Sequence, residues 1–177
     1  MSVTVRYILI MFFVANLLSC SNKKDAGKMK TLNQEQVTEK LMEANRIAIE
    51  TENEQIEKLI DSTGWKMEKT ATGLRYEIIK KGNGPEAKEG KTVRFGYEVR
   101  LISSEVIYSS DQSGLKEFKI GSGGVESGLE EGILKLGVGD KARFIIPSYL
   151  AHGLSGDQDK VPPKATLIYT VKLIEMK

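Results

Sequence analysis

Residues that carry covalent or metal chemistry are scarce in this sequence. Cysteine and histidine each occur once among 177 residues, as Cys20 and His152. One cysteine excludes a disulfide within the chain, and one histidine argues against a catalytic triad or a histidine-based metal site. A charge excess is missing as well, because 26 basic side chains face 24 acidic ones and the formal net charge is +2. A broad basic face, and with it a nucleic-acid partner, is therefore not expected.

A long apolar run lies at the N-terminus. In MSVTVRYILIMFFVANLLS, residues 1–19, a single charge at Arg6 precedes an apolar stretch whose length is typical of a signal-peptide core rather than of a membrane span. The run ends at LLSC, which resembles the lipobox of bacterial lipoproteins. That resemblance implies removal of residues 1–19, acylation of Cys20 and a stable lipid anchor. We expect a polar tether at 20–32 and a location in the cell envelope, on the periplasmic side of the outer membrane.

Residues 33–64 have the composition of a helical arm. The stretch contains no proline, is rich in helix-forming residues and ends at Gly64. Its apolar stripe is thin and is interrupted by ETENEQ at 50–55. The pattern therefore does not decide between one continuous helix and a helix with a break. Eight acidic against three basic side chains give the arm a net charge of −5. This charge favours a solvated spacer over tight dimerisation, and we expect a monomer.

From residue 65 onward the apolar pattern shortens to that of strands. Candidate strands lie at 74–79, 92–102, 105–109, 117–120, 142–147 and 166–174, separated by Gly, Asn and Pro clusters. The exception is SGLEEGILKLG at 127–137, whose apolar residues repeat at helical spacing and whose first turn carries two acids. One short helix among about six strands indicates an α+β fold, with an antiparallel sheet wrapped over that helix.

A long polar loop connects the last two candidate strands. It spans residues 148–165 and contains the pair Pro162-Pro163. Ordered connections of this length tend to be functional. Apolar residues that could pack and two prolines that restrict the backbone argue against disorder.

The order and spacing of several motifs resemble the FKBP-type peptidyl-prolyl isomerases over about residues 72–177. The motifs are TGLRYEIIKKGNG, VRFGYEVRL, IYSS, GLEEGILKLGVGDKARFIIP, LAHG and VPPKATLIYTVKL. The resemblance implies a curved antiparallel sheet around one short helix, an FKBP-type domain over 65–177, and a loop at 148–165 that forms a wall of the prolyl-peptide pocket. It implies no metal and no cofactor, because rotation about the X-Pro amide needs only a pocket that favours the twisted form.

Matching the family's pocket position by position yields ten candidate residues. In this resemblance the backbone N–H of Glu126 binds the peptide carbonyl, and the other residues line or rim the pocket. The ten are Tyr97, Ile107, Tyr108, Phe118, Val125, Glu126, Leu129, His152, Val161 and Tyr169.

Five of these positions depart from the family's pattern. Ile107-Tyr108 stands where Phe-Asp is typical, so a carboxylate is lost, and Leu129 stands where the pocket floor is usually Trp. His152 replaces a Tyr in the loop, and Glu126 replaces an apolar residue. The departures predict a shallower and more polar pocket with weak or lost isomerase activity.

Two functional hypotheses follow from this pattern. The first is a lipid-anchored peptidyl-prolyl cis-trans isomerase that acts on proline-containing polypeptides of the cell envelope. The second is an FKBP-like binding module that holds an envelope partner without accelerating isomerisation. The lipobox and the spacing that ends in GDQDK are similar to a narrower branch, the gliding-motility-associated FKBP-type lipoproteins.

Overall fold

The computed structural model describes residues 33–177. The predicted signal peptide at 1–19, Cys20 and the tether at 20–32 lie outside the described residues. None of the helices within 33–177 has both the length and the apolar character that crossing a bilayer requires.

The described chain forms a seven-stranded antiparallel sheet. The strands follow the order β1-β2-β6-β7-β3-β4, and β5 pairs separately with β3. Their bounds are β1 Glu68–Lys69, β2 Arg75–Lys80, β3 Thr92–Leu101, β4 Val106–Ser109, β5 Lys116–Lys119, β6 Lys141–Ile146 and β7 Leu167–Met176. All six predicted strands are confirmed within the usual uncertainty at strand ends. β1, the one-turn helix α3 (Ser110–Ser113) and the 3-10 turn η2 (Ser148–Leu150) are additions.

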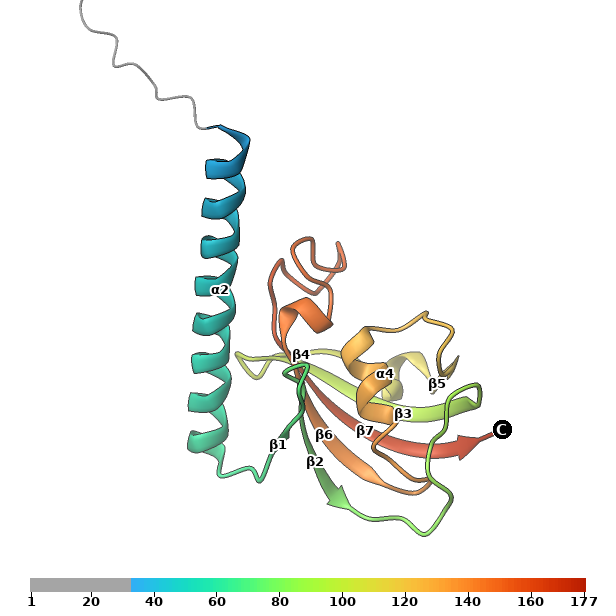
Figure 1. Ribbon diagram of the computed structural model, residues 1–177. Coiled ribbons are helices and arrows are strands. Elements are labelled where there is room, and N and C mark those ends of the chain that lie inside the picture. The colour runs from blue at the N-terminus through green and yellow to red at the C-terminus, as the bar shows by residue number, and fades with distance from the viewer. Residues whose placement is uncertain (1–32) are drawn as a thin grey trace, which may run out of the picture. The chain divides into compact units, whose positions relative to one another are not determined.

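The predicted short helix is α4 (Ser127–Ile133), and it lies against one face of the curved sheet (Figure 1). Alternate residues of β3 point toward that face, as the buried positions Val93, Phe95, Tyr97 and Val99 show. Gly132 lets α4 approach the sheet closely, because an added Cβ there would lie 2.9 Å from ring atoms of Phe144. The predicted α+β architecture, a curved antiparallel sheet around one short helix, is confirmed.

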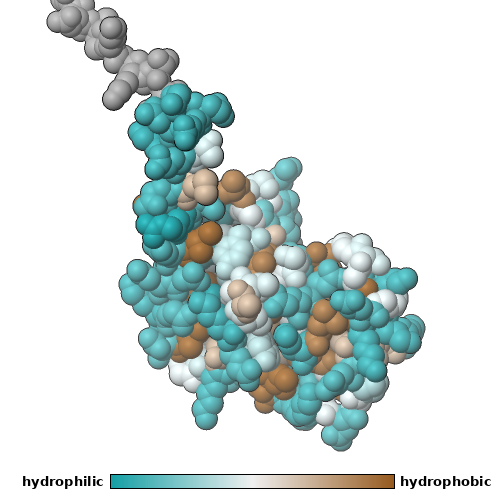
Figure 2. Space-filling view, in the orientation of Figure 1, coloured by the Kyte–Doolittle hydropathy of each residue, from teal (hydrophilic) through white to brown (hydrophobic). Residues whose placement is uncertain are grey.

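Most apolar side chains are enclosed between the sheet and α4. The face seen in Figure 2 is largely hydrophilic, and the hydrophobic residues on it form small, separate patches. Among the described residues, Leu154 in the long loop is the most exposed large apolar side chain, at 76%.

The arm is a single helix, α2 (Gln34–Thr63), without the break that the sequence left open. Asn33 caps its start: the Gln36 N–H donates to Asn33 Oδ1 at 2.8 Å, and the Asn33 N–H donates back to Gln36 Oε1. Gly64 ends it with a φ of 68°, a conformation that glycine adopts without steric cost.

The expectation of a solvated spacer is wrong for the C-terminal part of α2. Residues from Glu43 to Lys177 form one compact unit. Within it Ile56 is fully buried against Ile145 of β6 and Ile168 of β7. The thin stripe on α2 is therefore an interface with the sheet, and the compact unit includes this part of the arm.

Polar contacts hold the same part of α2. The buried guanidinium of Arg75, at the start of β2, donates to Asn53 Oδ1 at 2.9 Å and to Glu57 Oε1 at 2.6 Å. A buried charge is tolerated only when it is paired in this way. Some of the acidic side chains that favoured a solvated spacer therefore attach α2 to the sheet.

Candidate functional site

The structure brings eight of the ten predicted site residues into one apolar cluster. Six of the eight side chains are buried and two are partly buried, and they come from β3, β4, β5, α4, β7 and two loops. The buried six are Tyr97, Ile107, Phe118, Leu129, Val161 and Tyr169, and the partly buried two are Tyr108 and Val125. Leu129 is fully buried, so it serves as a packing residue of α4.

Glu126 lies at the N-cap of α4, at the edge of this cluster. Its carboxylate is only 8% exposed and accepts hydrogen bonds from the Tyr169 hydroxyl at 2.7 Å and from His152 Nε2 at 3.0 Å. Burial, and then the neighbouring carboxylate, raise the pKa of the Tyr169 phenol well above its usual value. The Tyr169 hydroxyl therefore keeps its proton and donates a hydrogen bond to the Glu126 carboxylate, which lies beside the apolar cluster.

The backbone N–H of Glu126 is available to a ligand. Within residues 33–177 this N–H donates to no backbone or side-chain acceptor. Its position beside Val125 and the start of α4 leaves it at the rim of the apolar cluster. An unpartnered N–H beside apolar side chains is the arrangement expected for binding a carbonyl oxygen.

A loop carboxylate replaces the one that sequence comparison counted as lost. The Tyr108 hydroxyl donates to Asp157 Oδ2, and it lies 3.1 Å from Asp159 Oδ2. Burial opposes ionisation of Asp157, but hydrogen bonds from Tyr108 and from the N–H groups of Asp159 and Val161 outweigh it, and the pKa of the Asp157 carboxyl falls to about 2. A carboxylate is thus present beside Tyr108, and the loop at 148–165 supplies it.

Two lysines balance part of this negative charge. Lys160 Nζ lies 5.3 Å from the centre of the Tyr108 ring and donates to the Ile107 carbonyl at 3.3 Å. Lys116 Nζ lies 5.3 Å from the centre of the Tyr97 ring. Cation–π contacts of this kind stabilise exposed aromatic faces modestly. The site therefore combines an apolar floor with a rim of mixed charge.

The loop at 148–165 is ordered by its own hydrogen bonds. The Gly153 N–H donates to the Ser148 carbonyl and the Lys164 N–H to the Gly153 carbonyl, each at 2.8 Å. At the tip, the Val161 N–H donates to Asp157 Oδ1 at 2.8 Å. Because His152, Asp157 and Val161 all contact the cluster or its rim, the loop forms a wall of the site, as the resemblance implied.

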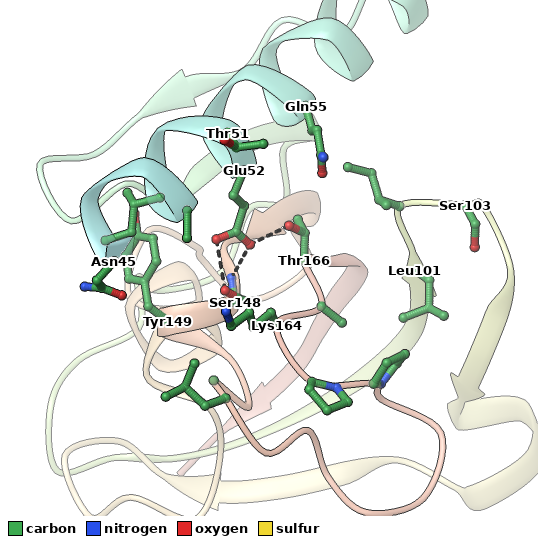
Figure 3. Close-up of a pocket in the computed structure, with 18 residues that line it drawn as sticks. Asn45, Thr51, Glu52, Gln55, Leu101, Ser103, Ser148, Tyr149, Lys164 and Thr166 are labelled. Atoms are coloured by element: carbon green, nitrogen blue, oxygen red, sulfur yellow. Dashed lines mark hydrogen bonds between the residues drawn. The ribbon is translucent and has the colours of Figure 1, made fainter. Parts of the chain in front are cut away.

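A hollow lies between α2 and the base of this loop. It has a volume of about 570 Å³ and is lined by residues of α2, of the turn after β3 and of the loop (Figure 3). Glu52 of α2 extends into it and bonds to Ser148 and Thr166. Sequence reasoning missed Glu52, Asp157 and Asp159 as site-related residues. The acid-rich string GDQDK was a signal for the two aspartates, whereas Glu52 was indistinguishable from its acidic neighbours.

The arrangement suits binding rather than covalent chemistry. Among the residues that the structure describes, no group of three or more His, Cys, Asp or Glu side chains could hold a metal ion. Within residues 33–177 the His152 ring contacts the Glu126 carboxylate and no hydroxyl or thiol that it could activate. In this part of the chain the site offers apolar side chains, a backbone N–H without an acceptor and a hydrogen-bonded carboxylate.

Comparison with known proteins identifies the family to which this fold belongs. The family model described as FKBP-type peptidyl-prolyl cis-trans isomerase matches residues 84–174. The probable FKBP-type peptidyl-prolyl cis-trans isomerase FkpA of Neisseria meningitidis serogroup B is 40% identical over 108 residues, which are 60% of this chain and 39% of that protein. FK506-binding protein 2 of Yarrowia lipolytica is 34% identical over 116 residues, which are 65% of this chain and 81% of that protein.

Solved structures show the same fold. FkpA from Escherichia coli is 25% identical with a TM-score of 0.64, over 98% of this chain and 91% of that chain. AtFKBP13 is 28% identical with a TM-score of 0.60, over 64% of this chain and 100% of that chain. Some curated relatives are much longer proteins, and the chain spans only 28% of FK506-binding protein 4 of Dictyostelium discoideum. From the family model, the relatives and the fold together, this chain belongs to the FKBP-type peptidyl-prolyl cis-trans isomerase family.

Proposed function

We propose that this protein is a peptidyl-prolyl cis-trans isomerase that acts on proline-containing segments of cell-envelope polypeptides. Membership of the FKBP-type family supports the proposal. The observation that carries it is the Glu126 N–H, which has no partner among the described residues and lies at the rim of the apolar cluster.

The reaction asks little of the protein. Rotation about an X-Pro amide faces a barrier of about 18–20 kcal/mol, because the planar amide is stabilised by resonance. The twisted amide has lost that resonance and part of its dipole, so an apolar, partly dehydrated surface accommodates it better than the planar form. In this scheme the proline ring packs on the cluster around Tyr97 and Tyr169. The Glu126 N–H holds the peptide carbonyl while the bond turns.

The Glu126 carboxylate should reduce this activity. It places a negative charge, fixed by Tyr169 and His152, next to the surface on which the proline would pack. A charge at such a position disfavours burial of an apolar ring, since the carboxylate would lose its remaining water. We therefore expect slower isomerisation than in a variant with an apolar residue at position 126.

Cis-trans exchange in a fluorogenic X-Pro peptide series tests the proposal. The protein is residues 20–177 with Cys20→Ser, which keeps every described residue. The wild-type sequence at all other positions should accelerate exchange, and Glu126→Ile should accelerate it further. Leu41→Ser, an exposed change on α2, is the control. A wild-type rate that stays at the spontaneous value at high micromolar protein contradicts the proposal.

The alternative function is an FKBP-like binding module for an envelope partner, and the buried Glu126 carboxylate is the observation that favours it. Under this alternative only Glu126→Ile restores exchange, while the wild type binds unfolded client proteins. Failure of the wild type to bind unfolded clients or any protein of an envelope extract would exclude this alternative.

We further propose that Cys20 carries a lipid that anchors the protein to the outer membrane, on its periplasmic side. The apolar run at 1–19 and the LLSC string support this. Palmitate labelling of cells should mark the wild-type protein but not Cys20→Ser, and protease added to intact cells should leave the protein uncut.

The spacing shared with gliding-motility-associated lipoproteins suggests a role in motility, and loss of surface spreading in a deletion strain would test it. We expect the chain without its lipid to sediment as a monomer.

A further inference from the structure

One carboxylate of the helical arm joins both ends of the loop that forms the pocket wall. Glu52 Oε1 accepts from the Ser148 N–H at 2.6 Å and from the Thr166 hydroxyl at 2.6 Å, and Oε2 accepts from the Ser148 hydroxyl at 2.9 Å. Figure 3 shows these bonds converging on Glu52 from the two sides of the loop. Ser148 is the first residue of the turn η2 and Thr166 directly precedes β7, so the bonds close the base of the loop.

The loop held in this way carries three residues of the candidate site. His152 donates to Glu126, Asp157 accepts from Tyr108, and Val161 packs in the apolar cluster. The Gly153 N–H bonds back to Ser148 and the Lys164 N–H bonds to Gly153. A displacement of Ser148 would therefore move Gly153 and, through it, Lys164 on the returning half of the loop.

Glu52 is itself fixed by the helix that bears it. One turn further along α2, Ile56 is fully buried against the sheet, and Asn53 and Glu57 bind the buried Arg75. These contacts hold the backbone of this part of α2, so the Glu52 carboxylate presents three charge-assisted acceptor sites at a set position. Ser148 and Thr166 are nearly buried, at 9% and 5% exposure, and without Glu52 their donors would lose partners that water replaces poorly.

We propose that Glu52 is a positioning residue of the isomerase site. It sets the separation of the two ends of the 148–165 loop and thereby places His152, Asp157 and Val161 against the pocket. The arm is then a working part of the isomerase unit. This inference rests on the proposed function, because it concerns the geometry of that same pocket.

Two substitutions at Glu52 and two matched controls test the inference in residues 20–177 with Cys20→Ser. Glu52→Gln keeps one acceptor oxygen and loses the charge, and Glu52→Ala removes all three bonds. Glu54→Gln removes the same charge from an exposed neighbour, and Glu57→Gln weakens the attachment of α2 through Arg75 without touching the loop.

Three measurements are made on each variant. They are kcat/KM for the X-Pro peptides, the amide hydrogen exchange of the loop compared with that of β7, and the ring NMR signals of His152. Since His152 is the only histidine of the chain, its signals in untagged protein report on the loop alone.

Glu52→Ala should lower kcat/KM about tenfold and speed exchange of the Gly153 and Lys164 amides about tenfold, the factor that corresponds to the loss of about one charge-assisted hydrogen bond. Exchange in β7 should not change. Glu52→Gln should have a smaller effect in the same direction, and the His152 signals should move in both Glu52 variants but in neither control.

Uniform acceleration of exchange in loop and sheet would overturn the inference, because it would mean that Glu52 only stabilises the fold. An effect of Glu57→Gln equal to that of Glu52→Gln would overturn it as well. If the wild type itself has no activity, the proposed function fails and Glu52 is not an isomerase residue. If the Glu52 variants then still speed amide exchange in the loop alone and shift the His152 signals, Glu52 positions the loop of a binding module.

Discussion

The hydrogen bond between Tyr169 and Glu126 gives a direct test of the site's unusual electrostatics. Tyr169 is 2% exposed, and its hydroxyl donates to the Glu126 carboxylate at 2.7 Å. Tyr169→Phe removes the donor and leaves the carboxylate with His152 as its remaining side-chain donor. A hydrogen bond to a charged group contributes about 1.5–3 kcal/mol, and a neutral one about 0.5–1.5 kcal/mol. We expect Tyr169→Phe to lower the free energy of unfolding by about 2 kcal/mol at neutral pH.

A double-mutant cycle isolates the charge. In a Glu126→Gln background the same Tyr169→Phe change removes a neutral hydrogen bond and should cost only about 1 kcal/mol, so a coupling energy of about 1 kcal/mol is expected. Urea unfolding, followed by circular dichroism, measures all four proteins. Tyr76→Phe is the control, because the Tyr76 hydroxyl donates to Glu68 in the same way but at the surface, where the loss should stay within about 0.5 kcal/mol. A coupling energy near zero would refute the inference that Tyr169 donates a charge-assisted hydrogen bond to the Glu126 carboxylate.

Three further predictions follow from the same contacts. The Asp157 carboxyl has a folded-state pKa of about 2, below its unfolded value of 3.8, so its ionised form stabilises the fold above about pH 4 and this contribution is lost as pH falls toward 2. Asp157→Asn should therefore cost about 1–2 kcal/mol at pH 7 and less at pH 3, measured by urea unfolding at both pH values, and a pH-independent cost would contradict the assignment. Ile56→Ala should lower the free energy of unfolding by about 2–4 kcal/mol, because a fully buried side chain is removed, whereas Leu41→Ala, at 66% exposure, should have almost no effect; equal thermal shifts would argue against the α2 interface. Gly156→Ala should disrupt the loop and reduce isomerisation, since Gly156 has a φ of 67° and an added Cβ would lie 2.1 Å from the Val161 carbonyl oxygen, and an unchanged rate would show that the loop does not shape the pocket.

Local patterns were sufficient for the six longer strands and for the helices α2 and α4, but not for the short elements β1, α3 and η2. The strands were predictable because burial on one face imposes alternation, as in β3, and α4 because its apolar residues repeat at helical spacing between an acidic first turn and Gly137. The helical arm was predicted as well, and the break that the acidic stretch at 50–55 left open does not occur. In the fold, acids of that stretch and of the next turn, Glu52 and Glu57, bind partners in the domain.

The candidate site was predictable only in part. Motif order identified the apolar residues, since apolar positions in a family keep their spacing and the cluster they form tolerates exchange of similar side chains. It did not reveal that Asp157 supplies the carboxylate missing at position 108, because the two residues are 49 positions apart and join only when the loop folds over β4. The same holds for the role of the Glu126 side chain, which depends on a hydroxyl from β7 and an imidazole from the loop.

The sequence by itself determined the elements, the absence of a disulfide within the chain and the order of the pocket motifs, because these depend on residue type and on spacing along the chain. Only the tertiary structure decided which acidic side chains are exposed to solvent and which accept hydrogen bonds from other parts of the domain. Glu52 and Glu54 have similar neighbours in the sequence. Glu52 accepts hydrogen bonds from Ser148 and Thr166, which lie 96 and 114 positions further along the chain, whereas Glu54 is exposed to solvent. The physical reason is that a carboxylate's role depends on the donors around it, and those donors are brought together by packing between distant segments.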